Sequence, residues 1–183
     1  MKVTKIVAIA LASALAGLTL AASAQVTVGG AAMYASRTIV DNAVNSKDHT
    51  TLVAAVKAAG LVDTLKSPGP FTVFAPTNTA FAALPPGTVD TLLKPENKAT
   101  LTKVLTYHVV AGKMDAATLM AAIQAGGGKT QLKTVAGGSL WASMSNGHVM
   151  LTDEKGDTAS VTIADVMQSN GVIHVIDKVM LPA

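Results

Sequence analysis

Residues 69–81, which read GPFTVFAPTNTAF, decide the fold because they place a turn, a strand and a helix start in direct succession. The two prolines and the glycine around the start of this stretch mark a turn. Phe71 to Ala75 is an apolar, β-favouring run closed by Pro76, which predicts a buried strand. Asn78 is a residue type that caps helices, so we expect it to cap a helix that carries Phe81.

Helical periodicity flanks this strand on both sides. On the N-terminal side, Leu52, Val56 and Ala59 share one helix face, and Gly60 ends that helix. A second helix with Leu101, Val104 and Leu105 on one face continues to His108. Weaker helices are expected over residues 61–66, 78–84 and 116–124.

The second half of the chain has the pattern of an antiparallel meander. Asn146-Gly147 stands between two alternating apolar runs and predicts a hairpin with a type I′ turn. Residues 172–176 are apolar on both faces, which is typical of a central strand. Strands are expected over residues 130–135, 139–145, 148–153, 159–166 and 172–177. Helices early and strands late predict a single α+β domain.

The first 24 residues have the pattern of a secretory signal peptide. Lys2 and Lys5 supply a positive start, residues 6–22 carry no charge, and Ala22-Ser23-Ala24 has the small-x-small form that signal peptidase cleaves. The alternative, an uncleaved membrane anchor, is disfavoured because the stretch is rich in alanine, serine, threonine and glycine. We therefore expect a secreted or periplasmic, extracellular location, with no membrane span after signal cleavage.

The mature chain is expected to consist of a flexible leader over residues 25–37 and a domain over residues 38–182. Without Lys2 and Lys5 it has 12 basic and 11 acidic side chains, a net charge of +1. This near-neutral surface and an aromatic content of 3% argue against a nucleic-acid partner. The absence of cysteine excludes disulfides, a thiol nucleophile and thiolate metal ligands.

The motifs that would indicate an enzyme are incomplete. Gly128-Lys129-Thr130 resembles the end of a phosphate-binding loop, but Ile123 occupies the position of the first glycine. Ser139 follows two glycines, yet Trp141 stands where a nucleophile elbow needs glycine. We expect no catalytic residues, no cofactor and no enzymatic activity.

The four histidines show no metal-ligand spacing, so no metal site is expected. His108 continues an apolar helix face and His174 lies within an apolar strand, so both are expected to be core residues with hydrogen-bond partners. We expect His49 and His148 to be exposed.

Three segments together resemble the fasciclin domain family. They are residues 69–81, the segment LTYHVV at residues 105–110, and the segment NGVIHVIDKVMLP at residues 170–182. Their order and spacing match the family over nearly the whole mature chain. The resemblance implies a fasciclin-like wedge of two β-sheets with helices packed against it.

The resemblance also implies a function, a binding or adhesion module for cell-surface or matrix interactions. Its partner would be a cell-envelope or matrix protein or polysaccharide. The alternative is a carrier of a small apolar ligand of the lipid or carotenoid type, for which the methionines at positions 114–180 offer an adaptable lining. In animal members the tyrosine–histidine motif is implicated in integrin binding, so Tyr107 and His108 are the candidate binding residues. Structural need alone also accounts for the pair, and we expect His108 to satisfy a carbonyl at the helix end.

Overall fold

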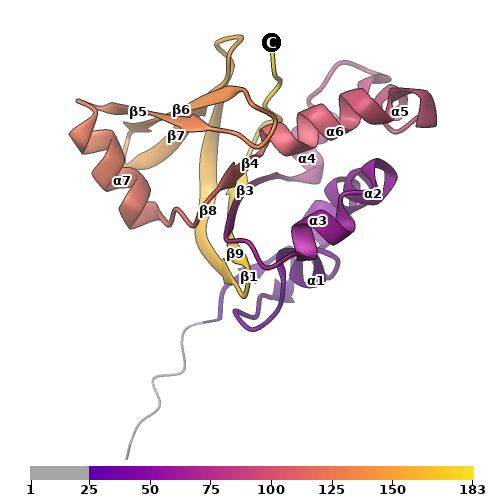
Figure 1. Cartoon of the computed structure of the whole chain (residues 1–183), viewed down its shortest axis with the longest axis horizontal. Helices are drawn as coiled ribbons and strands as arrows, with labels where there is room; N and C mark the ends of the chain where they lie inside the picture. Colours follow the sequence, from indigo (N-terminus) through magenta and orange to yellow (C-terminus); the bar gives the residue numbers. More distant parts are fainter. Residues whose placement is uncertain (1–24) are drawn as a thin grey trace, which may run out of the picture.

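The computed structural model describes residues 25–183, so the predicted signal peptide and its cleavage site lie outside the described residues. The predicted α+β class is confirmed: a seven-stranded sheet separates two groups of helices (Figure 1). The helices are α1 (Ile39–Ala43), α2 (Thr50–Ala59), α3 (Val62–Lys66), α4 (Asn78–Ala82), α5 (Thr88–Leu92), α6 (Lys98–Tyr107) and α7 (Ala116–Ala125), with 3₁₀ turns η1 (Lys47–His49) and η2 (Pro95–Asn97). The strands of the large sheet are β3 (Phe71–Pro76), β4 (Val109–Ala111), β5 (Lys129–Lys133), β6 (Ser139–Ser145), β7 (His148–Thr152), β8 (Thr158–Gln168) and β9 (Gly171–Ile176).

The two expected sheets are the halves of one continuous sheet in the order β4-β3-β9-β8-β7-β6-β5. The long strand β8 belongs to both halves, and its pairing with β9 is interrupted between Val161 and Ile163 and again between Ile163 and Val166. Such irregularities bend and twist a strand, so β8 turns the sheet through the corner of the wedge. A bridge between Val110 and Thr134 links the two ends of the sheet.

The deciding stretch folds as predicted, except at its helix cap. Strand β3 pairs parallel with β9 and antiparallel with β4. Thr77, not Asn78, caps α4, because its hydroxyl accepts from the Ala80 N–H at 3.2 Å. Asn78 is already helical, and its side chain accepts from the Thr51 N–H at 3.0 Å. It therefore satisfies a free donor at the start of α2, whose own N-cap His49 makes no capping bond.

The glycines at two strand connections have identifiable structural roles. Asn146 and Gly147 both have positive φ, 50° and 79°, as a type I′ hairpin turn between β6 and β7 demands. At Gly171 a Cβ would lie 1.9 Å from the Phe71 carbonyl oxygen, so the residue must be glycine for β9 to start this close to β3.

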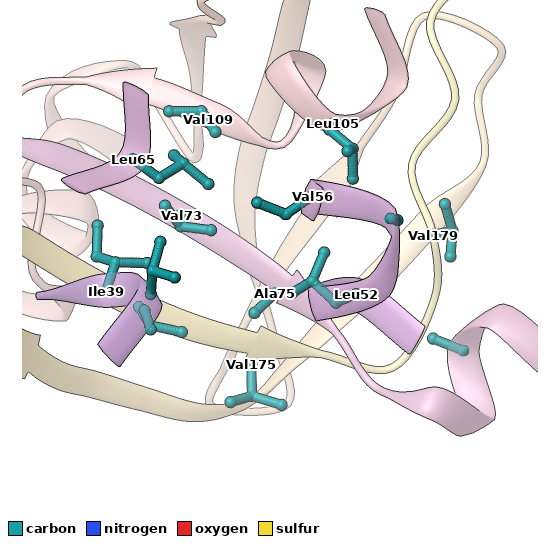
Figure 2. Packing of buried hydrophobic residues seen from close by; sticks show 14 of the residues in the cluster. Ile39, Leu52, Val56, Leu65, Val73, Ala75, Leu105, Val109, Val175 and Val179 are labelled. Carbon is teal, nitrogen blue, oxygen red and sulfur yellow. The ribbon is translucent and has the colours of Figure 1, made fainter. Parts of the chain in front are cut away.

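The core has two parts, one on each face of the sheet. One face packs against α1, α2 and α6 through Val73, Ala75 and Ile173, while Phe74 and Ile176 join the other part beneath α7. Figure 2 shows side chains of the first part converging from helices and strands. Every residue of β9 is buried, so its prediction as a central strand is confirmed.

Residues 25–37, for which a flexible leader was expected, take part in the fold in this structure. They form the hairpin β1 (Thr27–Val28) and β2 (Ala31–Ala32), and they bury Val28 and Met33 in the first part of the core. The Lys47 N–H donates to the Gly29 carbonyl at 3.2 Å and ties the hairpin to η1. These small residues carry too weak a periodicity to predict a strand, but they fit closely against the helices.

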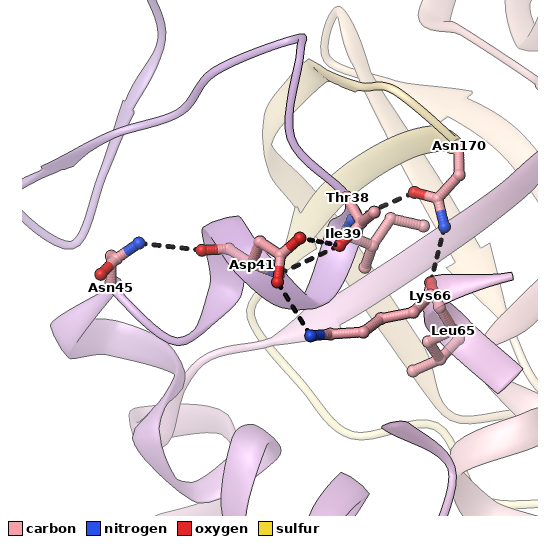
Figure 3. Close-up of polar contacts among 7 residues, drawn as sticks. All are labelled: Thr38, Ile39, Asp41, Asn45, Leu65, Lys66 and Asn170. Atoms are coloured by element: carbon pink, nitrogen blue, oxygen red, sulfur yellow. Dashed lines mark hydrogen bonds and ion pairs between the residues drawn. The ribbon is translucent and has the colours of Figure 1, made fainter. Parts of the chain in front are cut away.

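A single side chain at the β8–β9 turn joins three segments (Figure 3). The Asn170 carboxamide oxygen accepts from the Ile39 N–H at 3.0 Å, and its nitrogen donates to the carbonyls of Leu65 at 2.6 Å and Ser67 at 3.0 Å. Asn170 thus holds the start of α1 and the end of α3 against the sheet.

Candidate functional site

Tyr107 and His108, the candidate binding residues, lie where α6 ends and β4 begins. Tyr107 is the last residue of the helix and His108 is its C-cap. Leu101, Val104 and Leu105 form the buried face that precedes them, as the periodicity predicted.

The His108 imidazole connects the helix end to the C-terminal segment. Its Nδ1 lies 2.8 Å from the Val104 carbonyl oxygen, and the Met180 N–H points to its Nε2 at 2.9 Å. Since a backbone N–H can only donate, Nε2 accepts the hydrogen bond from Met180. Nδ1 is therefore protonated and donates a hydrogen bond to the Val104 carbonyl oxygen. The expected bond to a carbonyl at the helix end is therefore present, together with a second buried partner. Burial lowers the pKa of His108 to about 4, so the ring is neutral at neutral pH.

The Tyr107 side chain crosses to the other half of the wedge. Its hydroxyl donates to the Ser139 carbonyl at 2.6 Å and accepts from the Glu154 N–H at 3.2 Å. Burial raises the pKa of Tyr107 to about 12, so the phenol stays protonated. A Cβ at Gly138 would lie 2.8 Å from the ring, which explains the glycine there.

The pair presents no surface to a partner in this structure. Tyr107 is 0% exposed and His108 is 3% exposed, and the polar atoms of both rings have internal partners. The binding role of the pair stays a prediction, and it requires the pair to become accessible.

His174 is a core residue with partners, as expected. Its Nδ1 accepts from the Asp165 N–H at 3.3 Å, so Nε2 is the donor to the Met114 carbonyl at 2.7 Å. The ring stacks on Phe74 with centroids 5.7 Å apart. Burial lowers the pKa of His174, against the opposing effects of the Met114 bond and the charge of Asp165.

His49 is buried, which contradicts its predicted exposure, whereas His148 is exposed as expected. His49 is 3% exposed, and its Nδ1 lies 2.9 Å from the Ser46 hydroxyl, which is equally enclosed. Its Nε2 has no hydrogen-bond partner among the described residues. Burial lowers the pKa of His49, with the Ala75 backbone and the charge of Asp48 opposing that effect. The sequence around His49 is polar and therefore predicts exposure. The side chain of His49 is buried by the tertiary packing of α2 against β3.

His49 and Ser46 line an apolar cavity of about 70 Å³ between the helices and the sheet. Side chains from α1, α2, α3, β3, α6 and β9 enclose it, and Figure 2 shows several of them. The lining includes Ile39, Leu52, Val56, Leu65, Val73 and Leu105. Met33 is its one methionine among the described residues, so the methionines of the second half do not form this cavity.

The remaining polar groups show no further assembled site. Among residues 25–183, no three side chains of His, Cys, Asp or Glu are grouped so that they could hold a metal ion. No helix in the described part of the chain combines the length and hydropathy needed to cross a membrane.

The fold agrees with comparisons to known proteins. The model of the Fasciclin domain matches residues 47–182. The chain belongs to the fasciclin domain family. It is 52% identical over 155 residues to Protein sll1483 of Synechocystis, across 85% of this chain and 79% of that protein.

Animal relatives of this fasciclin domain are longer proteins. The pig transforming growth factor-beta-induced protein ig-h3 is 38% identical over 79% of this chain, which spans 19% of that protein. Among solved structures, a FAS1 domain pair from the insect cell adhesion molecule Fasciclin I superposes with a TM-score of 0.71. That likeness has 20% sequence identity and covers 79% of this chain and 51% of the other, so it supports the fold alone.

Proposed function

We propose that this fasciclin domain is a secreted or periplasmic binding module that mediates cell-surface or matrix interactions and catalyses no reaction. The observation that carries the proposal is its membership of the fasciclin domain family across residues 47–182, because that family is the one whose resemblance implies binding or adhesion. The proposed partner is a protein or polysaccharide of the cell envelope or matrix.

The burial of Tyr107 and His108 supports a contact surface elsewhere on the domain. Large apolar side chains exposed among the described residues include Tyr34, Val44 and Met144. The Arg37 guanidinium lies over the Tyr34 ring, 5.0 Å from its centroid. Tyrosine and arginine are, with tryptophan, the residue types enriched at energetically important interface positions, so Tyr34 with Arg37 is the first surface to test.

The test is capture from an envelope extract on the immobilised mature protein, with mass spectrometry of bound proteins and chemical analysis of bound polysaccharides. We expect a component retained by the wild type and by Met144→Ser, which alters an exposed residue on the β6–β7 hairpin. Tyr34→Ser is expected to retain less. Capture no greater than on an unrelated folded domain would refute the binding module, and equal capture by Tyr34→Ser would refute this surface.

The proposed location has a separate test. The intact mass of the protein from the cell-envelope fraction is expected to correspond to a chain that starts at Gln25. A mature species that retains Lys2 and Lys5 would contradict export with cleavage after Ala24.

A further inference from the structure

The part of the sheet that contains β5 and β6 has one covered face and one open face. Helix α7 packs on the covered face, where Leu132, Leu140 and Ala142 belong to the second part of the core (Figure 1). Because successive side chains of a strand point to opposite faces, the alternate residues of both strands lie on the open face. Each of these six residues is exposed or partly exposed: Lys129, Gln131, Lys133, Ser139, Trp141 and Ser143.

Trp141, the single tryptophan of the chain, lies in the middle of this open face. It stands opposite Gln131 on β5 and opposite Thr152 on β7. Its indole is partly exposed, and the Lys129 Nζ lies over the ring, 5.4 Å from the ring centroid. The face therefore offers an apolar aromatic surface and a positive charge side by side.

We propose that this open face, the Trp141 face, binds a polysaccharide whose sugar units carry carboxylate groups. The inference rests on the proposed binding function and names a partner class for it, on a surface other than that of Tyr34 and Arg37.

The charges of the Trp141 face are complementary to an anionic polymer. Its two lysines, Lys129 and Lys133, stand four residues apart on β5, so their Cα atoms lie about 13 Å apart along the strand. Neither β5 nor β6 contains an acidic residue, and neither lysine has an ion-pair partner among the described residues. The carboxylate of Glu154 at the end of the face already accepts from the N–H groups of Ser139 and Ala183. Carboxylates repeated along a polymer can therefore pair with both lysines.

The uncharged side chains of the Trp141 face favour a sugar over a protein. The Gln131 side-chain nitrogen donates to the Ser139 hydroxyl at 2.8 Å, which orders both groups on the face. Amide and hydroxyl groups donate and accept hydrogen bonds, as the hydroxyls of a sugar do. The C–H side of a sugar ring is apolar and can pack on the indole of Trp141. The six positions carry no aliphatic side chain of the kind found in the apolar centre of a protein interface.

The test compares three probes by calorimetric titration of the mature chain. The first is an oligogalacturonate, the second is its methyl ester, which keeps the sugars and removes the charges, and the third is a polyglutamate of similar length, which keeps carboxylates and removes the sugars. We expect the oligogalacturonate to bind more tightly than either of the others. Its affinity should fall as the salt concentration rises, because the lysines are exposed and salt screens exposed charges.

Three substitutions locate the binding on the Trp141 face. Trp141→Ala is expected to weaken binding of the oligogalacturonate at least about 5-fold, as at other aromatic anchors of an interface. Lys129→Gln and Lys133→Gln should each weaken it about 2–5-fold, the loss of one exposed ion pair. Lys57→Gln is the matched control, because it removes the same charge from an exposed position on α2, and it is expected to leave the affinity unchanged.

A second measurement, on the wild type, keeps the test valid if Trp141→Ala does not fold. Because Trp141 is the single tryptophan, the fluorescence emission of the chain reports directly on this face. The emission is expected to change with the oligogalacturonate and to change less with its methyl ester.

Four outcomes would overturn the proposal. They are no binding of the oligogalacturonate, equal binding of its methyl ester or of polyglutamate, equal effects of Lys133→Gln and Lys57→Gln, and binding that leaves the emission of Trp141 unchanged. If any of these occurs while an envelope component is still captured, this inference is refuted and the binding module stands. Failure of that capture as well would refute the proposed function itself.

Discussion

Replacing His108 with alanine is expected to lower the free energy of unfolding by about 2–6 kcal/mol. The substitution removes the bond to the Val104 carbonyl and the bond from the Met180 N–H, each shorter than 3.0 Å. Both backbone groups are buried, and each unpaired group costs about 1–3 kcal/mol. For a domain of this size the melting temperature should fall by roughly 2–4 °C for each kcal/mol.

The measurement is thermal and urea unfolding followed by circular dichroism, with His148→Ala as the control. His148 is exposed, so its removal should change the free energy of unfolding by less than about 0.5 kcal/mol. The same proteins are then compared for capture of the envelope component. A His108→Ala protein with an unchanged melting temperature and lost capture would refute the structural role and make the pair a recognition site.

Four further predictions concern pH, two side chains and metals. Burial lowers the pKa of His108 from 6.5 to about 4. As the pH decreases below 6.5, the unfolded chain therefore binds a proton that the folded protein does not, and the free energy of unfolding decreases. Urea titrations should show a loss of about 2 kcal/mol between pH 8 and 5 from this residue, a part of the slope that is absent in His108→Ala. Asn170→Ala should lower the free energy of unfolding in urea by about 2–4 kcal/mol, because it removes three hydrogen bonds. The control Asn45→Ala, at an exposed residue, should lower it by less than about 0.5 kcal/mol. Equal effects of the two substitutions would contradict the role of Asn170. Tyr107→Phe should cost about 1–2 kcal/mol through its two hydroxyl bonds, and no change relative to the exposed Tyr34→Phe would be the opposing result. EDTA should leave the melting temperature unchanged, because the described residues contain no grouped metal ligands; a fall of several degrees would reveal a structural metal.

The sequence predicts helix ends and turns correctly where the backbone conformation favours one or two residue types, such as glycine and asparagine. Gly60 has φ of 71° at the end of α2, and Asn146-Gly147 adopts the predicted turn. The apolar residues of β9 predict a central strand that is covered on both faces. In the structure all of its residues are buried, and β9 pairs with β3 on one side and with β8 on the other. These features depend on local backbone preferences and on burial, which the order of residue types expresses directly.

Features that depend on contacts between distant segments were missed. The short helix α1 is held at its start by Asn170, 131 positions along the chain from Ile39. The β1–β2 hairpin is stabilised by packing on η1, and His49 is buried because Ser46 and the strand β3 surround it. No local periodicity encodes these contacts, so the sequence predicted neither the hairpin nor the burial of His49.

The position of the tyrosine–histidine pair limits what binding experiments on it can show. Tyr107 belongs to the core beneath α7 and holds the β5–β6 and β7–β8 connections through Ser139 and Glu154. His108 lines the cavity on the opposite face of the sheet and holds the C-terminal segment. Because the two adjacent residues connect both halves of the wedge, a substitution at either one can displace surfaces far from itself. Lost binding after such a substitution therefore locates a contact only when the variant keeps the stability of the wild type.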